Sequence, residues 1–155
     1  MDERTWLIRA YAGAPDSLRQ ALDALPQGRL DVRPAPGQWS PREIALHLCD
    51  AEVASVFRLK RTIAEPGGTV PAFDQDRWTE ALARVEDLDP ALAVFGALRA
   101  EMAGILRRLP ADAWERTAVH PEAGAHTLED WLRRIVRHAE NHIGQIRAQG
   151  AAGTG

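Results

Sequence analysis

Apolar residues recur three and four positions apart in four stretches of this sequence, and this spacing limits the possible fold more than any other feature. Such spacing places the apolar residues on one face of an α-helix. The four predicted helices cover residues 3–25, 41–64, 89–109 and 127–149. Residues 115–126 lack a strand-like alternation and are expected to form a loop. The pattern predicts an all-α fold, a four-helix bundle with a long crossover between helices 2 and 3.

Local signals mark where these helices begin. A Ser or Thr followed three residues later by an acidic residue, the capping-box pattern, occurs at 40–43 and at 127–130. An Asp-Pro pair at 89–90 gives the third helix its start, with Asp89 in the capping position. Pro15 lies inside the first stretch and predicts a kink, because proline removes a backbone donor and clashes one turn back. The crossover is expected to contain a short helix within residues 73–85.

The length and net charge of the chain limit the classes of protein to which it can belong. Its 155 residues predict a single domain over residues 1–149, followed by a flexible tail at 150–155. The net charge of -3 gives no electrostatic case for nucleic-acid binding. No apolar run approaches the roughly 20 residues needed to span a membrane, and the charged N-terminus lacks the apolar centre of a signal peptide. With a single cysteine, Cys49, the chain is expected to be cytoplasmic.

Three histidines occupy unusual positions on the predicted helices. His138 and His142 are four residues apart and lie on the flank of the apolar stripe of the last helix. His47 lies on the flank of the apolar face of the second helix. Three neutral imidazoles suit zinc or nickel and leave a coordination position open for water or substrate. An H-x-x-x-H pair alone is common without a metal, and the absence of Glu after His138 disfavours metalloprotease chemistry.

Several polar residues lie near these histidines on the predicted helices. Those expected to hydrogen-bond the ligands are Asp50, Glu52, Asn141, Gln145 and Glu43. Glu52 is also interpreted as a buried carboxylate that pairs with a tryptophan indole or a loop amide. Arg58 is expected to pair with a glutamate at the surface, although it could meet an anionic substrate. His120 and His126 are expected to be solvated in a loop.

The sequence resembles the DinB-like (YfiT-like) family of four-helix-bundle metalloenzymes over nearly its whole length. The segments that carry the resemblance are residues 33–40, 43–52, 73–78, 127–130 and 138–146. The divalent-metal triad of that family is one histidine of the second helix and an H-x-x-x-H pair of the last. The resemblance therefore places one divalent metal ion, zinc or nickel, on His47, His138 and His142.

The resemblance also implies a range of activities. Members include transferases that use low-molecular-weight thiols such as bacillithiol, a mycothiol-dependent isomerase, and proteins described as metal-dependent hydrolases. We expect a metal-dependent thiol S-transferase acting on a small molecule. The alternatives are a metal-dependent hydrolase, a non-catalytic stress-linked metal or ligand-binding module, and a structural bundle whose histidines are core remnants. Homodimers occur among relatives, although no exposed stripe in this sequence demands one.

Overall fold

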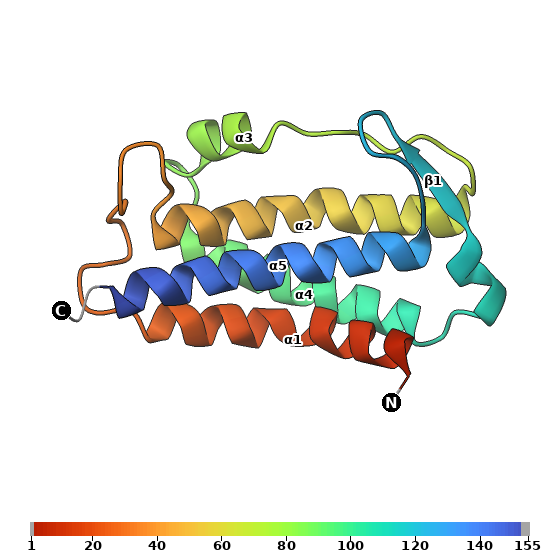
Figure 1. The fold of residues 1–155 in the computed structure, drawn as a ribbon, viewed down its shortest axis with the longest axis horizontal. Helices are drawn as coiled ribbons and strands as arrows, with labels where there is room; N and C mark the ends of the chain where they lie inside the picture. The colour runs from red at the N-terminus through yellow and green to blue at the C-terminus, as the bar shows by residue number, and fades with distance from the viewer. Residues whose placement is uncertain (1, 153–155) are drawn as a thin grey trace.

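Four long helices form the body of the molecule (Figure 1). The computed structural model describes residues 2–152. The bundle helices are α1 (Glu3–Asp23), α2 (Pro41–Ala64), α4 (Leu88–Leu106) and α5 (Leu128–Ala151). A fifth helix, α3 (Gln75–Leu82), lies outside the bundle against α2. The predicted four-helix bundle with a long crossover is confirmed. Among the described residues, none of the helices has the length and apolar character that a membrane span requires.

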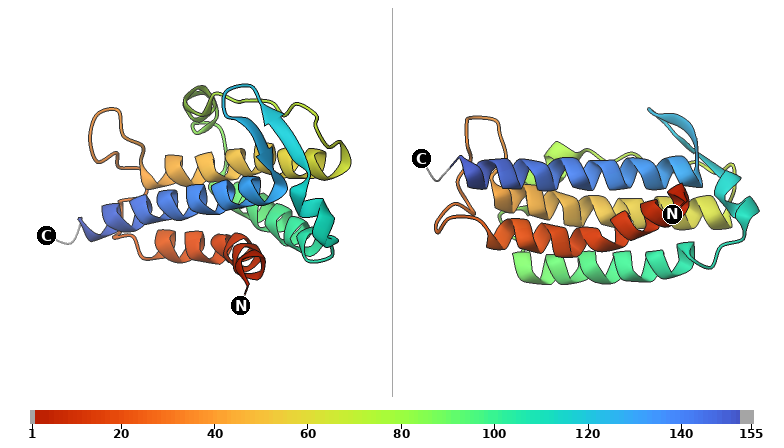
Figure 2. Two further views of the ribbon diagram at one scale, coloured as in Figure 1. Left: turned by 45° about the vertical axis from the view of Figure 1, so that its right-hand side comes forward. Right: turned by 60° about the horizontal axis from the view of Figure 1, so that its bottom comes forward.

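The crossover determines which helices are neighbours. It runs back along the bundle, so α2 and α4 point the same way while α1 and α5 point the opposite way (Figures 1 and 2). Both α1 and α2 pack against α4 and α5, which leaves α1 and α2 at opposite corners. Helices α1 and α2 are antiparallel, as are α4 and α5, but neither pair packs as adjacent partners. As a result α2 and α5, which carry the three histidines, lie side by side.

The helix starts follow the local sequence signals. Both predicted capping boxes form, with Ser40 and Glu43 at α2 and with Thr127 and Asp130 at α5. Helix α4 begins earlier than the Asp-Pro pair predicts, at Leu88, and its capping residue makes no side-chain hydrogen bond. Helix α1 continues through its proline as one helix whose path bends (Figure 2). Helix α5 extends to residue 151, into the predicted tail, whose residues 153–155 lie outside the described residues.

The expectation that residues 115–126 form a loop is wrong. A short 3-10 helix (Ala111–Glu115) leads into an antiparallel hairpin of β1 (Thr117–His120) and β2 (Gly124–Thr127). Gly124 opens β2 with a φ of 82°, a conformation that glycine adopts without strain. Backbone hydrogen bonds join Val119 of β1 to the crossover, to Gly68 and Val70. The hairpin and the crossover thus cover one end of the α2–α5 pair (Figure 2).

The core consists of two apolar clusters along the bundle. The predicted apolar positions of α2 and α5 are all buried, which confirms their periodicity. In α4 the buried face also includes an unpredicted arginine, Arg99, which is only 2% exposed. It lies between Phe95 of one cluster and Met102 of the other. A buried charged group therefore lies between the two apolar clusters of the core.

Candidate metal centre and adjoining cavity

The structure brings the three predicted histidines together between α2 and α5. His47 Nε2 lies 3.1 Å from His138 Nε2. The ligand atoms of His47, His138 and His142 all lie within 4.8 Å of one another. Their ring centroids are 4.6 to 5.1 Å apart. The registry of two antiparallel helices, rather than any local sequence signal, is what places His47 opposite the other two.

Burial keeps these imidazoles neutral. Desolvation, followed by repulsion from the neighbouring histidines, lowers the pKa of His47 to about 3. Desolvation, with His142 and Arg99 adding repulsion, lowers the pKa of His138 to about 4. Desolvation also lowers the pKa of His142, and its hydrogen bond with Gln145 opposes that effect. Neutral imidazole is the form that binds a metal ion.

The donor set fits a divalent ion. Two nitrogens bound to one tetrahedral zinc at about 2.0–2.1 Å are separated by about 3.3 Å, close to the Nε2–Nε2 distance of the first two histidines. His47 Nδ1 is buried and has no hydrogen-bond partner among the described residues. A hydrogen bond could satisfy only one pair of the three clustered nitrogens, whereas one ion satisfies all three. The residues present therefore suit a three-histidine metal centre.

Side chains around the cluster fix the orientation of the rings. His142 Nδ1 donates to Gln145 Oε1 at 2.9 Å, which leaves His142 Nε2 unprotonated for a metal. The Trp39 ring lies 4.8 Å from the His47 ring and is stacked 6.1 Å from the His142 ring. The side chain of Gln149 on α5 donates to the backbone carbonyl of Trp39 at 3.1 Å, which helps to hold Trp39 beside the two histidines.

We predict that replacing Gln145 by leucine weakens metal binding about tenfold, the low end of the 10–100-fold range for hydrogen-bonding partners of ligands. The low end is expected because Gln145 is exposed and water can replace its amide. Competition against a chromophoric chelator would measure the affinity. Gln20→Leu, on the exposed face of α1, is the matched control. An unchanged affinity in Gln145→Leu would show that this hydrogen bond does not support the site.

The other predicted hydrogen-bonding residues have different roles. The Glu52 carboxylate pairs with Arg99, at 2.8 Å, and accepts from the Tyr11 hydroxyl. The expectation of a tryptophan indole or loop amide as its partner is wrong, because the buried arginine takes that place. Glu43 is used by the capping box and by Arg33. Asn141 lies on α5 and lines the cavity beside the metal centre.

Asp50 faces Glu86 instead of a ligand histidine. Desolvation and the Glu86 carboxylate raise the pKa of Asp50 from 3.8 to about 6. A raised pKa means that the fold favours the protonated acid, which donates to Glu86. This contribution to stability is present below about pH 4 and is lost as the pH rises through about 6.

We therefore predict that Asp50→Asn is more stable than the unsubstituted protein at pH 8, by about 1 to 3 kcal/mol. The amide can still donate to Glu86 but cannot ionise, so the difference should vanish near pH 4. Urea unfolding from pH 4 to pH 8 measures this, with the exposed Asp16→Asn as control. A stability difference that does not change with pH would contradict the assignment.

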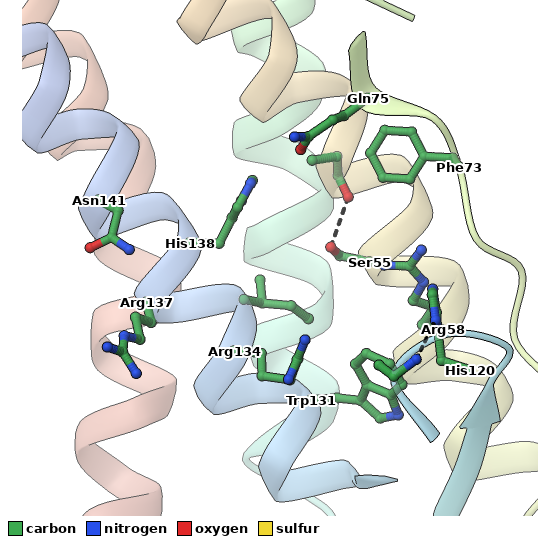
Figure 3. Close-up of a pocket in the computed structure, with 13 residues that line it drawn as sticks. Ser55, Arg58, Phe73, Gln75, His120, Trp131, Arg134, Arg137, His138 and Asn141 are labelled. Carbon is green, nitrogen blue, oxygen red and sulfur yellow. Dashed lines mark hydrogen bonds between the residues drawn. The ribbon is translucent and has the colours of Figure 1, made fainter. Parts of the chain in front are cut away.

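A cavity of about 450 Å³ extends from the metal centre along α2 and α5 (Figure 3). His138 and Asn141 line it near the cluster. The remaining lining residues come from α2, the crossover, the hairpin and α5: Ala51, Ser55, Arg58, Phe73, Gln75, His120, Ala123, Trp131, Arg134, Ile135 and Arg137. None of these described lining residues is an aspartate or a glutamate. The cavity therefore offers cationic, amide and aromatic groups to a ligand.

Three sequence expectations about this region are wrong. His120 is not solvated in a loop: it is 8% exposed, on the inward side of β1. His126 is half-buried in β2 with its ring 4.9 Å from the Trp131 ring. Arg58 makes no surface ion pair with a glutamate in the described part of the chain and instead donates to the Pro71 carbonyl. Burial alternates along residues 117–120 and places His120 inside, but no alternation of apolar and polar residues marks this in the sequence.

Comparison with known proteins supports this picture. A family model described as the DinB superfamily matches residues 10–146. YfiT of Bacillus subtilis (strain 168), whose name assigns it provisionally to the metal-dependent hydrolases, is 28% identical over 141 residues, covering 90% of this chain and 79% of YfiT. A Bacillus cereus (strain B4264) protein with the same provisional assignment is 26% identical over 142 residues, covering 92% of this chain and 82% of its own.

Solved structures show the same architecture. The structure of YfiT from Bacillus subtilis, described as a probable metal-dependent hydrolase with an unusual four-helix bundle topology, superposes with a TM-score of 0.90. It is 25% identical, and the match covers 98% of this chain and 89% of YfiT. The four-helix bundle protein TT2238 matches at a TM-score of 0.66 with 19% identity, over 94% of this chain and 98% of its own. The latter likeness concerns the fold alone.

Proposed function

This chain belongs to the DinB superfamily, and we propose that it is a divalent-metal-dependent enzyme that transfers a low-molecular-weight thiol to an electrophilic small molecule. His47, His138 and His142 would hold one zinc or nickel ion. When bound, the ion lowers the pKa of a coordinated thiol or water, which supplies a nucleophile at neutral pH. Three protein ligands leave a position for that group.

The cavity beside His138 is the observation that carries the choice of thiol transfer. Activation of water in a metallohydrolase of the H-E-x-x-H kind uses a glutamate as general base. No aspartate or glutamate lines the cavity among the residues that the structure describes. The two buried carboxylates of α2 have other partners: Glu52 pairs with Arg99 and Tyr11, and Asp50 faces Glu86. A thiol needs no such base, because its proton is more acidic than that of water.

The chain's own side chains bind and orient the reactants in this proposal. Asn141 and Gln75 present amide groups in the cavity, where they can hold polar atoms of a substrate. Trp131 and Ile135 give it an apolar floor. Cys49 is not the nucleophile, since burial, together with nearby Asp50, raises the pKa of its thiol to about 12. The sulfur of the cosubstrate bonds to the electrophilic carbon, the leaving group departs with the bonding electrons, and the thiol proton passes to solvent.

A metal-dependent hydrolase is the second candidate, and the names of the YfiT-like relatives favour it. The same three histidines would serve, with water in place of the thiol. The two reactions differ in the nucleophile consumed, so they can be separated by supplying or withholding a thiol.

The test begins with the metal content of the purified protein, which should be close to one ion per chain. The metallated protein is then assayed with bacillithiol, mycothiol and glutathione against a simple electrophile such as monobromobimane, and with ester and amide substrates in the absence of thiol. Thiol-dependent turnover supports the proposal, and turnover with water alone replaces it with the hydrolase. A loaded protein that is silent in both assays is a binding module, and a protein that takes up no ion ends the metal hypothesis.

A further inference from the structure

The cavity has a second polar end, away from the histidine cluster, that neither the metal centre nor the thiol explains. We propose that Arg58, His120 and Arg134 form a subsite that binds a carboxylate of the substrate. Only one part of this proposal rests on the proposed function, namely that the carboxylate belongs to a molecule that reacts at the metal centre.

Trp131 is the common platform of the three groups. The guanidinium carbons of Arg58 and Arg134 lie 5.8 Å and 6.0 Å from the centre of its ring, and the centre of the His120 ring lies 6.0 Å from it. The groups come from α2, β1 and α5, so the fold gathers them from three separate parts of the chain. Figure 3 shows Arg58 and His120 beside Trp131 at this end of the cavity.

Within residues 2–152, the two arginines at this end are not neutralised by an ion pair, although the nearby Glu122 carboxylate acts on His120 and raises its pKa in part. Neither Arg58 nor Arg134 forms an ion pair in the part of the chain that the structure describes, whereas seven other arginines do: Arg4, Arg33, Arg42, Arg61, Arg99, Arg116 and Arg133. Burial and then the charge of Arg134 lower the pKa of Arg58, so the fold holds two guanidinium groups against their mutual repulsion. A bound anion would relieve that repulsion.

His120 contributes a donor of defined orientation. Its Nδ1 accepts from the backbone N–H groups of Glu122 and Ala123, each at 3.2 Å. Because Nδ1 accepts, the proton of the neutral ring must be on Nε2. Desolvation and the charge of Arg58 lower the pKa of His120, which favours this neutral form. The neutral ring can therefore only donate a hydrogen bond at Nε2. This nitrogen can bind an anion but cannot accept from a hydrogen-bond donor.

The geometry also limits the size of the ligand. Arg58 uses Nε and Nη2 on the Pro71 carbonyl, which leaves Nη1 and the Arg134 guanidinium, with His120 Nε2, for the two oxygens of a carboxylate. Trp131 precedes His138 by seven residues, which is about 10 Å along α5. The expected substrate is therefore an elongated small molecule whose carboxylate is about 10 Å from its reacting atom.

Succinate and its uncharged analogue succinamide test the subsite without requiring turnover. Binding to the full chain is followed by the NMR signal of the Trp131 indole N–H, assigned with Trp131→Phe, before and after loading with zinc. Succinate should bind about tenfold or more tightly than succinamide in both states, because the subsite does not need the metal. Equal binding of the two, or succinate binding only after zinc is loaded, would overturn the proposal.

Variants locate the binding. Arg58→Gln and Arg134→Gln should each weaken succinate binding about tenfold, while Arg58→Lys should retain part of it and guards against loss of folding. Arg147→Gln, an exposed arginine on α5 outside this cavity, should change nothing. Phosphate binding tighter than succinate would refute the assignment to a carboxylate. Succinate binding without any turnover would contradict the proposed function alone, and turnover with an unchanged KM in Arg58→Gln would contradict the subsite alone.

Discussion

Replacing His142 by alanine is expected to release the divalent ion and to abolish every activity that depends on it. His142 would supply one of the three ligand nitrogens of the proposed metal centre, and its hydrogen bond to Gln145 orients the ring for that role. Loss of a ligand should weaken binding by more than the roughly 100-fold upper range for loss of a ligand's hydrogen-bonding partner. Metal analysis after dialysis, and the absorption spectrum of the cobalt-substituted protein, would measure the loss.

The same substitution should also remove the stabilisation that the ion provides. An excess of metal at 1,000 times its Kd stabilises a folded protein by about 4 kcal/mol, so the Tm of the unsubstituted protein should rise with added zinc while that of His142→Ala should not. His126→Ala is the control, since His126 lies in β2 against Trp131 and outside the cluster. If His142→Ala kept one tightly held ion per chain, the ligands would have been assigned wrongly.

The helices could be predicted because their signals are local. A capping box needs only residues 40–43 or 127–130, and the apolar periodicity of α2 and α5 needs only neighbouring turns. Predicting the histidine triad required more than local signals, because the distance from His47 to the last helix depends on how α2 and α5 pack. Periodicity placed each histidine on a flank of an apolar face, and the family resemblance supplied the partnership.

The hairpin and the carboxylate subsite could not be predicted from local pattern. Strands of four residues are too short for alternation to stand out, and a two-stranded hairpin is marginal by itself. This hairpin is held by hydrogen bonds from the crossover to Val119 and by packing of β1 against α2 and of β2 against α5. His120 enters the cavity only because of those contacts between distant segments.

Arg99 shows a different limit of sequence reasoning. The apolar spacing within residues 89–109 predicts a buried face formed by Phe95, Leu98, Met102, Ile105 and Leu109. Phe95 and Met102 are buried, but the other three are only partly buried, while Arg99 is almost fully enclosed. An arginine can be buried only if it is paired, and its partner Glu52 lies 47 residues away on α2. Whether a particular arginine of this chain is buried therefore depends on a partner from another helix, and local spacing cannot reveal that partner.

Replacing Arg99 by methionine is expected to destabilise the fold by about 3 to 5 kcal/mol, because it leaves the buried Glu52 carboxylate without its counter-charge. Arg99 also donates to the Tyr11 carbonyl at 3.0 Å and lies 4.4 Å and 4.6 Å from the Tyr11 and Phe95 rings, so several contacts are lost together. For a chain of this size the Tm should fall by roughly 6 to 20 °C. Chemical unfolding and calorimetry would measure both quantities.

Removing the charge of Glu52 at the same time should restore much of that stability. In the double variant Glu52→Gln with Arg99→Met, no unpaired charge is buried, and the amide oxygen introduced at position 52 can still accept from Tyr11. Burial and the Glu52 charge raise the pKa of Tyr11, so its hydroxyl stays protonated and able to donate. The double variant should therefore be more stable than Arg99→Met alone, with a coupling energy in the range of about 0.5–3 kcal/mol seen for residues in contact. Additive losses would mean that Arg99 stabilises the bundle by packing against the aromatic rings and not through its ion pair with Glu52. The buried arginine would then be explained by its shape and packing and not by its charge.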